Sequence, residues 1–429
     1  MKILFVYPGF QRHADVHPEL RTYVPMNEYL GSPSLGIASV AAMTPDDWEL
    51  EMRDDRLAPA DYETDADIVA LSFFTPAATR ALQLADWFRA QGKTVVAGGI
   101  FPTAMPDVVQ PHVDAVVVGE GEPVWPRLLD DFRAGCLAPR YTAAPCDLVG
   151  LPLPRVDLYF TQEGPSFHPD DYPLQLSRGC PLACRACILP TSMGGACRTH
   201  TLDHVLGQLA NLSKAGKRAC LTEDTSWLPG APRELLKTFL QTLVDRGERA
   251  SVSYVGTSMT MIRSTPAATL TLAKEAGVDM FYLVTGFDPI TMRAWTGQDD
   301  RAYTRALEAV AKSWDAGIEP YASFLYGSDY DDEGTVDRIL EFCHTSKIRK
   351  CEFAVATPYP GTPDWYRIEA EGRLLTREWR HYNDTTCVYR PAQLTPEQVE
   401  AGYLRLWRDF YANRPDLSAL SVYDRTIQF

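Results

Sequence analysis

Hydrophobic positions in the first third of the chain alternate between short β-type runs and longer stretches with helical spacing. The β-type runs predict strands over residues 2–7, 48–53, 67–72, 94–97 and 115–118. Between them, apolar side chains recur at the spacing of an amphipathic helix over residues 34–42, 78–91 and 123–134. Strands that alternate with helices in this way predict an α/β fold, here a Rossmann-like, doubly wound parallel sheet.

A second series of β/α units follows a linker with the sequence Leu-Pro-Leu-Pro at residues 151–154. Strands are expected over residues 174–177, 219–223, 251–257, 280–285, 320–326 and 351–356. Helical spacing is found at residues 202–215, 233–246 and 303–316, and a last helix is expected at 396–411. We therefore predict an N-terminal domain at 1–147, a linker at 148–171, a second domain at 172–365 and a C-terminal cap region at 366–429.

Composition narrows the possible partners and the compartment. The net charge of -15 leaves no broad basic surface for nucleic acid. No run of about eighteen apolar residues is present, so no membrane span is expected. The N-terminal apolar run is too short for a signal peptide, which predicts a cytoplasmic protein. In that setting the ten cysteines are thiols or metal ligands rather than disulfides.

The ends of the predicted N-terminal strands carry glycines and small polar residues. In open sheets of this kind, ligands bind beyond the C-terminal ends of the strands. Glycine lets the backbone approach a bulky ligand, and hydroxyl groups can donate hydrogen bonds. A glycine after a strand can also merely make a turn, but four such ends together favour a large ligand with polar edges. The candidate residues are Pro8, Gly9, Ser72, Phe74, Thr75, Gly98, Gly99, Gly119 and Glu120.

Three cysteines, Cys180, Cys184 and Cys187, fall within eight residues in a predicted loop. Thiolates are soft ligands that suit iron-sulfur clusters and zinc. A structural zinc site normally has four closed ligands, and no second C-x-x-C pair is present. Cys197 and Cys220 remain candidates for a fourth ligand, so zinc or a plain four-thiolate cluster stays an alternative at this point. Arg198, close to the same loop, could contact a ligand, but taken alone it is better explained by packing or by an ion pair.

The N-terminal third resembles the cobalamin-binding domain that precedes many radical S-adenosylmethionine (SAM) enzymes. The resemblance rests on Pro-Ser-Leu-Gly at 33–36, Ala-Asp-Ile-Val-Ala-Leu-Ser at 66–72, Val-Val-Ala-Gly-Gly at 95–99 and Val-Val-Gly-Glu-Gly-Glu at 117–122. The D-x-H-x-x-G loop, whose histidine binds cobalt in some cobalamin proteins, is not present. His17 is therefore interpreted as an ordinary loop histidine, and Phe74, Thr75 or their neighbours are expected at the lower face of the corrin.

The spacing C-x-x-x-C-x-x-C, preceded by Ser-Arg-Gly, resembles the defining motif of the radical SAM superfamily. This resemblance implies a partial (β/α)6 barrel and a [4Fe-4S] cluster whose open iron binds SAM. Reduction of SAM then yields a 5'-deoxyadenosyl radical. The same resemblance implies that the ends of the barrel strands bind SAM, through Glu223 or Asp224, Gly286, Thr357 and Pro358. For Asp224 a helix N-cap is an equally good reading.

The family resemblance implies a cobalamin-dependent radical SAM enzyme that abstracts hydrogen from a small-molecule substrate and transfers a methyl group from methylcobalamin to a carbon. Within this family the same domains also support cyclisation, rearrangement and carbon-carbon coupling without net methylation. An electron donor such as flavodoxin or ferredoxin is expected as a partner. The alternative from a different class is a non-catalytic protein with an iron-sulfur or zinc centre.

Overall fold

A parallel sheet of six strands, in the order β2-β1-β3-β4-β5-β6, forms the N-terminal half. The computed structural model describes residues 1–23, 33–164, 169, 171–221, 225–249, 251–285, 293–297 and 299–412. The strands are β1 (Lys2–Tyr7), β2 (Glu49–Asp54), β3 (Ile68–Ser72), β4 (Thr94–Gly98), β5 (Ala115–Val118) and β6 (Arg140–Thr142). The order reverses between β1 and β3, and such a switch point is where ligands bind in doubly wound sheets.

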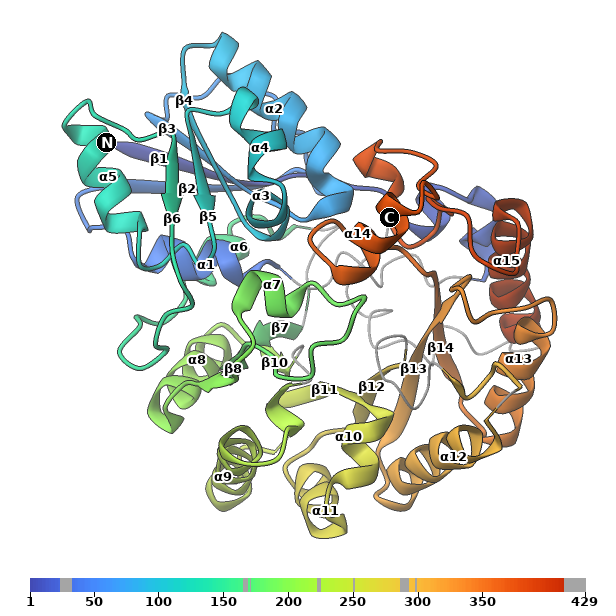
Figure 1. Cartoon of the computed structure of the whole chain (residues 1–429). Helices are drawn as coiled ribbons and strands as arrows, with labels where there is room; N and C mark the ends of the chain where they lie inside the picture. The colour runs from blue at the N-terminus through green and yellow to red at the C-terminus, as the bar shows by residue number, and fades with distance from the viewer. Residues whose placement is uncertain are drawn as a thin grey trace.

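Helices cover both faces of this sheet (Figure 1). They are α1 (Leu35–Ala42), α2 (Ala78–Ala90), α3 (Ile100–Ala104), α4 (Pro106–Val109) and α5 (Trp125–Arg133), followed by α6 (Asp157–Phe160). Because successive side chains of a strand point to opposite faces, Ile3 and Phe5 pack with α1 and α5. Leu4 and Val6 pack with α2 on the other face.

A second parallel sheet of six strands curves into a partial barrel, in the order β14-β13-β12-β11-β10-β7 (Figure 1). Its strands are β7 (Asp171–Leu174), β10 (Arg218–Leu221), β11 (Val252–Ser258), β12 (Met280–Val284), β13 (Glu319–Tyr326) and β14 (Lys350–Val355). The surrounding helices are α8 (Leu202–Lys214), α9 (Ala231–Arg246), α10 (Met259–Ser264), α11 (Ala267–Glu275), α12 (Asp300–Asp315) and α13 (Thr335–Thr345).

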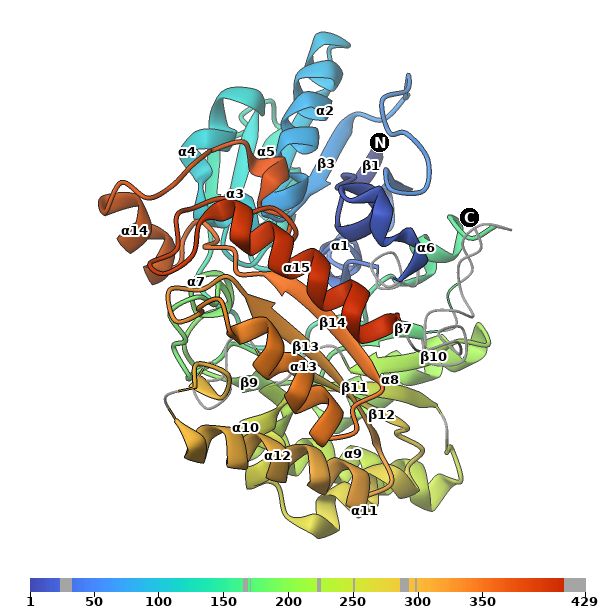
Figure 2. The same ribbon diagram turned by 90° about the vertical axis from the view of Figure 1, so that its right-hand side faces the viewer.

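The C-terminal region contacts both halves of the molecule. Helix α14 (Pro363–Ala370) follows the last barrel strand, and α15 (Pro396–Tyr411) lies along β14 (Figure 2). Trp379 and Tyr382 belong to the apolar core on the α2 face of the N-terminal sheet, where the ring of Trp379 lies 5.2 Å from that of Phe101. This region therefore buries apolar surface on the N-terminal sheet as well as on the barrel. The domain boundaries at residues 147, 171 and 365 stay predictions.

The first barrel strand ends earlier than the sequence predicts. We expected a strand at 174–177, whereas β7 ends at Leu174. The reason is the side chain of Gln208, which accepts a hydrogen bond from the backbone N–H of Gln175 and donates one to its carbonyl. These backbone groups are therefore used outside the sheet. The next two residues form β8 (Ser177–Arg178), which pairs antiparallel with β9 (Arg198–Thr199).

In the part of the chain that the structure describes, no helix combines the length and the apolar character needed to cross a lipid bilayer.

Candidate functional site

A cavity of about 490 Å³ opens at the C-terminal edge of the N-terminal sheet, and we call it the sheet-end cavity. The end of β1 contributes Tyr7, and the loop after β3 contributes Ser72 and Phe74. Glycines after β4 and β5 form another wall. Part of the lining comes from the second domain, through Gln175, Arg178, Ser192 and Met193. The cavity thus lies at the switch point of the sheet and faces the barrel.

Most of the predicted strand-end residues meet at this cavity. Those that line it are Ser72, Phe74, Gly98, Gly99, Gly119 and Glu120. Pro8, Gly9 and Thr75 are not part of the lining. The N–H of Gly9 instead donates to Asp55 over 2.9 Å, and Thr75 begins a buried turn that leads into α2. The residues that follow β1 therefore make contacts within the N-terminal domain and do not contribute to the cavity wall.

The backbone conformation explains why glycines form this wall of the cavity. Gly99 has φ +103°, and a Cβ there would lie 2.8 Å from the carbonyl oxygen of Phe73. Gly119 has φ +91°, and a Cβ would lie 2.1 Å from the oxygen of Ala143. Both positions require glycine, so these parts of the wall present backbone rather than side chains. A wall of this kind fits a large, flat ligand with amide groups at its edge.

His17 lies away from the sheet-end cavity. Its Nε2 is 3.1 Å from the backbone oxygen of Thr385, and its ring lies 5.7 Å from that of Tyr403 in α15. The interpretation of His17 as an ordinary loop histidine agrees with these contacts.

Cys180, Cys184 and Cys187 lie on one excursion of the chain, residues 179–197, which we call the cysteine loop. The β8–β9 ladder closes its base. Gly179 enters the loop with φ +83°, and a Cβ there would collide with the carbonyl oxygen of Ala196 at 2.2 Å. Inside the loop, the N–H of Cys187 donates to the oxygen of Cys184. The sequence Ser-Arg-Gly-Cys thus forms the narrow neck of a loop that α7 (Leu189–Met193) completes.

The far side of the cysteine loop is held by the segment after β14. Thr191 donates a hydrogen bond to the carbonyl oxygen of Gly361, and the N–H of Asp364 donates to that of Arg185. The guanidinium of Arg185 also lies 3.1 Å from the carboxylate of Asp364. The turn with the sequence Thr-Pro-Tyr-Pro-Gly-Thr is therefore a support for this loop.

The thiols differ in exposure, with Cys180 buried and Cys184 and Cys187 partly exposed. Among the described residues, no three His, Cys, Asp or Glu side chains converge as a single metal ion would require. A four-iron cluster makes a different demand, because each thiolate binds its own iron.

A second cavity, of about 770 Å³, lies at the C-terminal ends of the barrel strands, and we call it the barrel-mouth cavity. The cysteine loop lines it with Cys184 and its neighbours from Leu182 to Ala186. Thr357 and Pro358, predicted from the end of the sixth barrel strand, also line it. The predicted SAM ligands Glu223, Asp224 and Gly286 fall outside the described residues.

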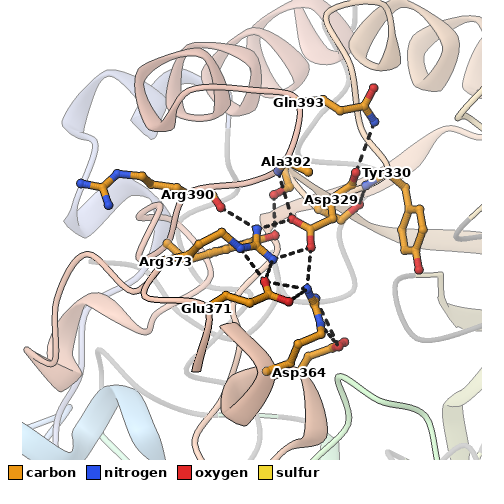
Figure 3. A network of polar contacts seen from close by, with 12 residues as sticks. Asp329, Tyr330, Asp364, Glu371, Arg373, Arg390, Ala392 and Gln393 are labelled. Atoms are coloured by element: carbon orange, nitrogen blue, oxygen red, sulfur yellow. Dashed lines mark hydrogen bonds and ion pairs between the residues drawn. The ribbon is translucent and has the colours of Figure 1, made fainter. Parts of the chain in front are cut away.

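A charge network forms one wall of the barrel-mouth cavity (Figure 3). Asp329 lies on the loop after β13 and binds two arginines from the C-terminal region, Arg367 at 3.0 Å and Arg373 at 2.7 Å. Asp329 also accepts a hydrogen bond from the N–H of Ala392. Burial raises the pKa of Asp331, two residues later, to about 6, although hydrogen bonds from the Ser328 hydroxyl and N–H and from the Gly327 N–H oppose the rise.

Glu120, a predicted cofactor-binding residue, lines the sheet-end cavity, but the protein itself binds its carboxylate. Arg198 donates to both oxygens over 2.6 and 2.9 Å, and the N–H of Cys146 donates over 2.9 Å. Burial would raise the pKa of Glu120, but the hydrogen bonds from Arg198 and Cys146 outweigh it and lower the pKa. Burial and this carboxylate raise the pKa of the Cys146 thiol to about 12. Glu120 therefore acts as the anion of an ion pair, and Arg198 belongs to that pair.

Arg178 and Glu122 were not singled out in the sequence, although both line the sheet-end cavity. They lie 2.7 Å apart across the two halves of the molecule. The available signal was their position, since Arg178 immediately precedes Gly179 of the cysteine motif and Glu122 ends Gly-Glu-Gly-Glu. Residues so far apart in sequence can be recognised as a pair only from the three-dimensional structure.

Comparison with known proteins agrees with this architecture. The family model of the B12 binding domain matches residues 30–129. The chain is 26% identical over 412 residues to bacteriochlorophyllide d C-12(1)-methyltransferase of Chlorobaculum tepidum, covering 92% of this chain and 86% of the relative. It is 25% identical over 390 residues to the C-8(2)-methyltransferase of the same organism, covering 88% and 85%.

Solved structures of the radical SAM methyltransferase TsrM from Kitasatospora setae share the fold. One, with tryptophan substrate and a SAM analogue bound, superposes with a TM-score of 0.67 at 15% identity and covers 94% of this chain and 88% of TsrM. Another, with cobalamin and a [4Fe-4S] cluster bound, has a TM-score of 0.65 at 14% identity, with 95% and 88% covered. The predicted fold class is thereby confirmed. The chain is an enzyme with a B12 binding domain at residues 30–129, and over most of its length it resembles methyltransferases and shares the fold of a radical SAM enzyme.

Proposed function

We propose that this enzyme transfers a methyl group from SAM, by way of a bound corrin, to a carbon atom of a small-molecule substrate. One observation carries the proposal: the cysteine loop borders both cavities. Ser192 and Met193 line the sheet-end cavity, and Cys184 lines the barrel-mouth cavity. A cluster held by the loop would therefore lie between the site for a corrin and the site for SAM and substrate.

The residues present suit each group. The sheet-end cavity offers backbone at Gly98, Gly99 and Gly119 and a hydroxyl at Ser72, which match a large ring system with amide edges. Cys180, Cys184 and Cys187 offer three thiolates, the ligands that iron-sulfur clusters prefer. When bound, the cluster supplies the electron that cleaves SAM, and the corrin supplies the methyl group.

The chain's own residues would hold these reactants and keep water out. The β8–β9 ladder closes the neck of the cysteine loop and so fixes both ends of the segment that carries the three thiolates. Thr357 and Pro358 would border SAM in the barrel-mouth cavity, and the predicted roles of Glu223, Asp224 and Gly286 belong to the same proposal. Orientation of this kind is the protein's contribution when a cofactor carries the chemistry.

The test is a single-turnover assay of the protein loaded with cluster and hydroxocobalamin. It uses reduced flavodoxin or ferredoxin and SAM with a deuterated methyl group. Methyl transfer predicts S-adenosylhomocysteine, 5'-deoxyadenosine and a deuterated product when candidate substrates are supplied. Formation of 5'-deoxyadenosine without label in the product would favour cyclisation or rearrangement. Absence of both nucleosides under all conditions would favour the non-catalytic alternative and overturn the proposal.

A further inference from the structure

Both strands that close the cysteine loop carry an arginine that reaches across to the N-terminal sheet. Arg178 is on β8 and Arg198 is its cross-strand partner on β9. Arg178 binds Glu122 over 2.7 Å, and Arg198 binds Glu120 over 2.6 Å. Both glutamates lie on the loop that follows β5. We call these four residues the interdomain network.

The interdomain network is largely shielded from solvent. The exposed fractions of the side chains are 9% for Arg178, 18% for Arg198, 5% for Glu120 and 6% for Glu122. At such burial the attraction is little screened by salt, and loss of one partner leaves an uncompensated charge. The network therefore resists separation of the cysteine loop from the sheet.

Further hydrogen bonds fix the geometry of each arginine. The Nε of Arg178 donates to Gln175 over 2.7 Å, and Glu120 lies 3.8 Å from its Nη1. Arg198 donates to the backbone oxygens of Met193 and Cys146. Besides its pair with Glu120, Arg198 thus connects β9 to α7 of the cysteine loop, through Met193, and to the segment after β6, through Cys146. A planar guanidinium with several donors suits this role better than a lysine.

The network also borders the ligand site. Glu120, Glu122 and Arg178 all line the sheet-end cavity. Arg178 lies two residues before Cys180. The same ion pairs thus lie beside the cavity for the corrin and at the base of the loop with the thiols.

We infer that Arg178 and Arg198 are positioning residues that set the distance between the corrin and the cluster through Glu122 and Glu120. This inference rests on the proposed function for the identity of the two groups, but the network itself does not depend on it. A charge-neutral substitution should let the base of the cysteine loop move, and the distance between the two centres should then become less uniform.

The distance can be measured in the holoenzyme, because cob(II)alamin and the reduced cluster are both paramagnetic. Pulsed electron paramagnetic resonance should give one narrow distribution of dipolar couplings for the natural protein. Arg178→Gln and Glu122→Gln should broaden it at least twofold, and Arg178→Lys should broaden it less. Glu163→Gln is the matched control, since Glu163 forms an equally buried pair with Lys217 at 2.7 Å and lines neither cavity. Unchanged distributions in both neutral variants with both centres bound would overturn the inference.

A second measurement uses the protein without cofactors. The N–H of Cys146 donates to Glu120, so Glu120→Ala, which removes the acceptor, should speed hydrogen exchange of the Cys146 N–H at least tenfold. Glu163→Ala should leave this exchange rate as in the natural protein. An unchanged exchange rate in Glu120→Ala would count against the network, whether or not cobalamin binds. Failure of hydroxocobalamin to bind the natural protein would instead count against the proposed function.

Discussion

Asp329 and Arg373 form a two-pronged ion pair, with Oδ1 2.7 Å from Nη1 and Oδ2 2.8 Å from Nη2. Asp329 lines the barrel-mouth cavity, and Arg373 lies in the C-terminal region after α14. One wall of the barrel-mouth cavity is therefore tied to a segment that also packs on the N-terminal sheet through Trp379. Stability of this region and shape of the cavity depend on the same contact.

Asp329→Asn should lower the free energy of unfolding by about 1–2 kcal/mol, between the values for exposed and buried ion pairs. The side chains of Asp329 and Arg373 are about one-fifth exposed, at 19% and 20%. The substitution also removes a partner of Arg367. Urea unfolding followed by circular dichroism measures the change. Asp337→Asn is the matched control, because its partner Arg405 is 40% exposed and Asp337 itself is 65% exposed. Equal effects of the two substitutions would contradict a special role of Asp329.

Gly98→Leu should block the sheet-end cavity without disturbing the fold. Gly98 lines the cavity, and a Cβ there would meet only Val117 at an ordinary 3.5 Å. The leucine side chain therefore has to occupy space that the corrin would need. We expect the dissociation constant for hydroxocobalamin to rise at least tenfold, measured by absorbance titration, with the melting temperature within a few degrees of the natural protein.

Gly98→Ala is the graded control, since a methyl group at this position fits beside Val117. It should bind hydroxocobalamin within about threefold of the natural protein. Full binding by Gly98→Leu would show that the corrin lies elsewhere.

Replacing any cysteine of the motif should abolish the cluster. Cys184→Ala removes a thiolate that lines the barrel-mouth cavity, and a four-iron cluster cannot keep its remaining ligation unchanged. Iron and sulfide analysis after anaerobic reconstitution should fall from about four of each per chain to below one. Cys136→Ala, at an exposed cysteine outside the loop, should retain the full content. Retention of the cluster in Cys184→Ala would contradict the assignment.

The elements with clear periodicity could be predicted from the sequence. The strand at residues 2–7 and the helix at 396–411 agree with β1 and α15 at both ends. The first barrel strand is wrong by three residues because a side chain distant in sequence, Gln208, takes its backbone hydrogen bonds. Strand β6 was not predicted, since three residues at a sheet edge carry too little periodicity.

The candidate site could likewise be predicted only in part, because some of its contacts join residues that are distant in sequence. Glycines at strand ends can be recognised along the chain because the backbone requires them, as at Gly99 and Gly119. The partner of a charged residue cannot be recognised in this way. Glu120 was expected to face a ligand, and its bond to Arg198 depends on how two domains meet. Asp329 was missed altogether, because its partners also lie far along the chain.

Acid should destabilise the protein through His200, which is 6% exposed, lines a small pocket together with Arg178 and stacks on His204 with ring centroids 4.1 Å apart. Burial, followed by the charges of His204, Arg178 and Arg198, lowers the pKa of His200 to about 3, from 6.5 in the unfolded chain. Below pH 6.5 the unfolded state therefore takes up a proton that the folded state does not, and stability falls as pH decreases toward 3.

At pH 5 this difference amounts to about 2 kcal/mol relative to pH 7. His200→Gln removes the titrating group, so the loss of unfolding free energy between pH 7 and pH 5 should shrink by about that amount. Urea unfolding at both pH values measures it, and His344→Gln, at an exposed histidine of α13, controls for the removal of a histidine as such. A His200→Gln variant that loses as much stability as the natural protein would show that other groups govern the response to acid.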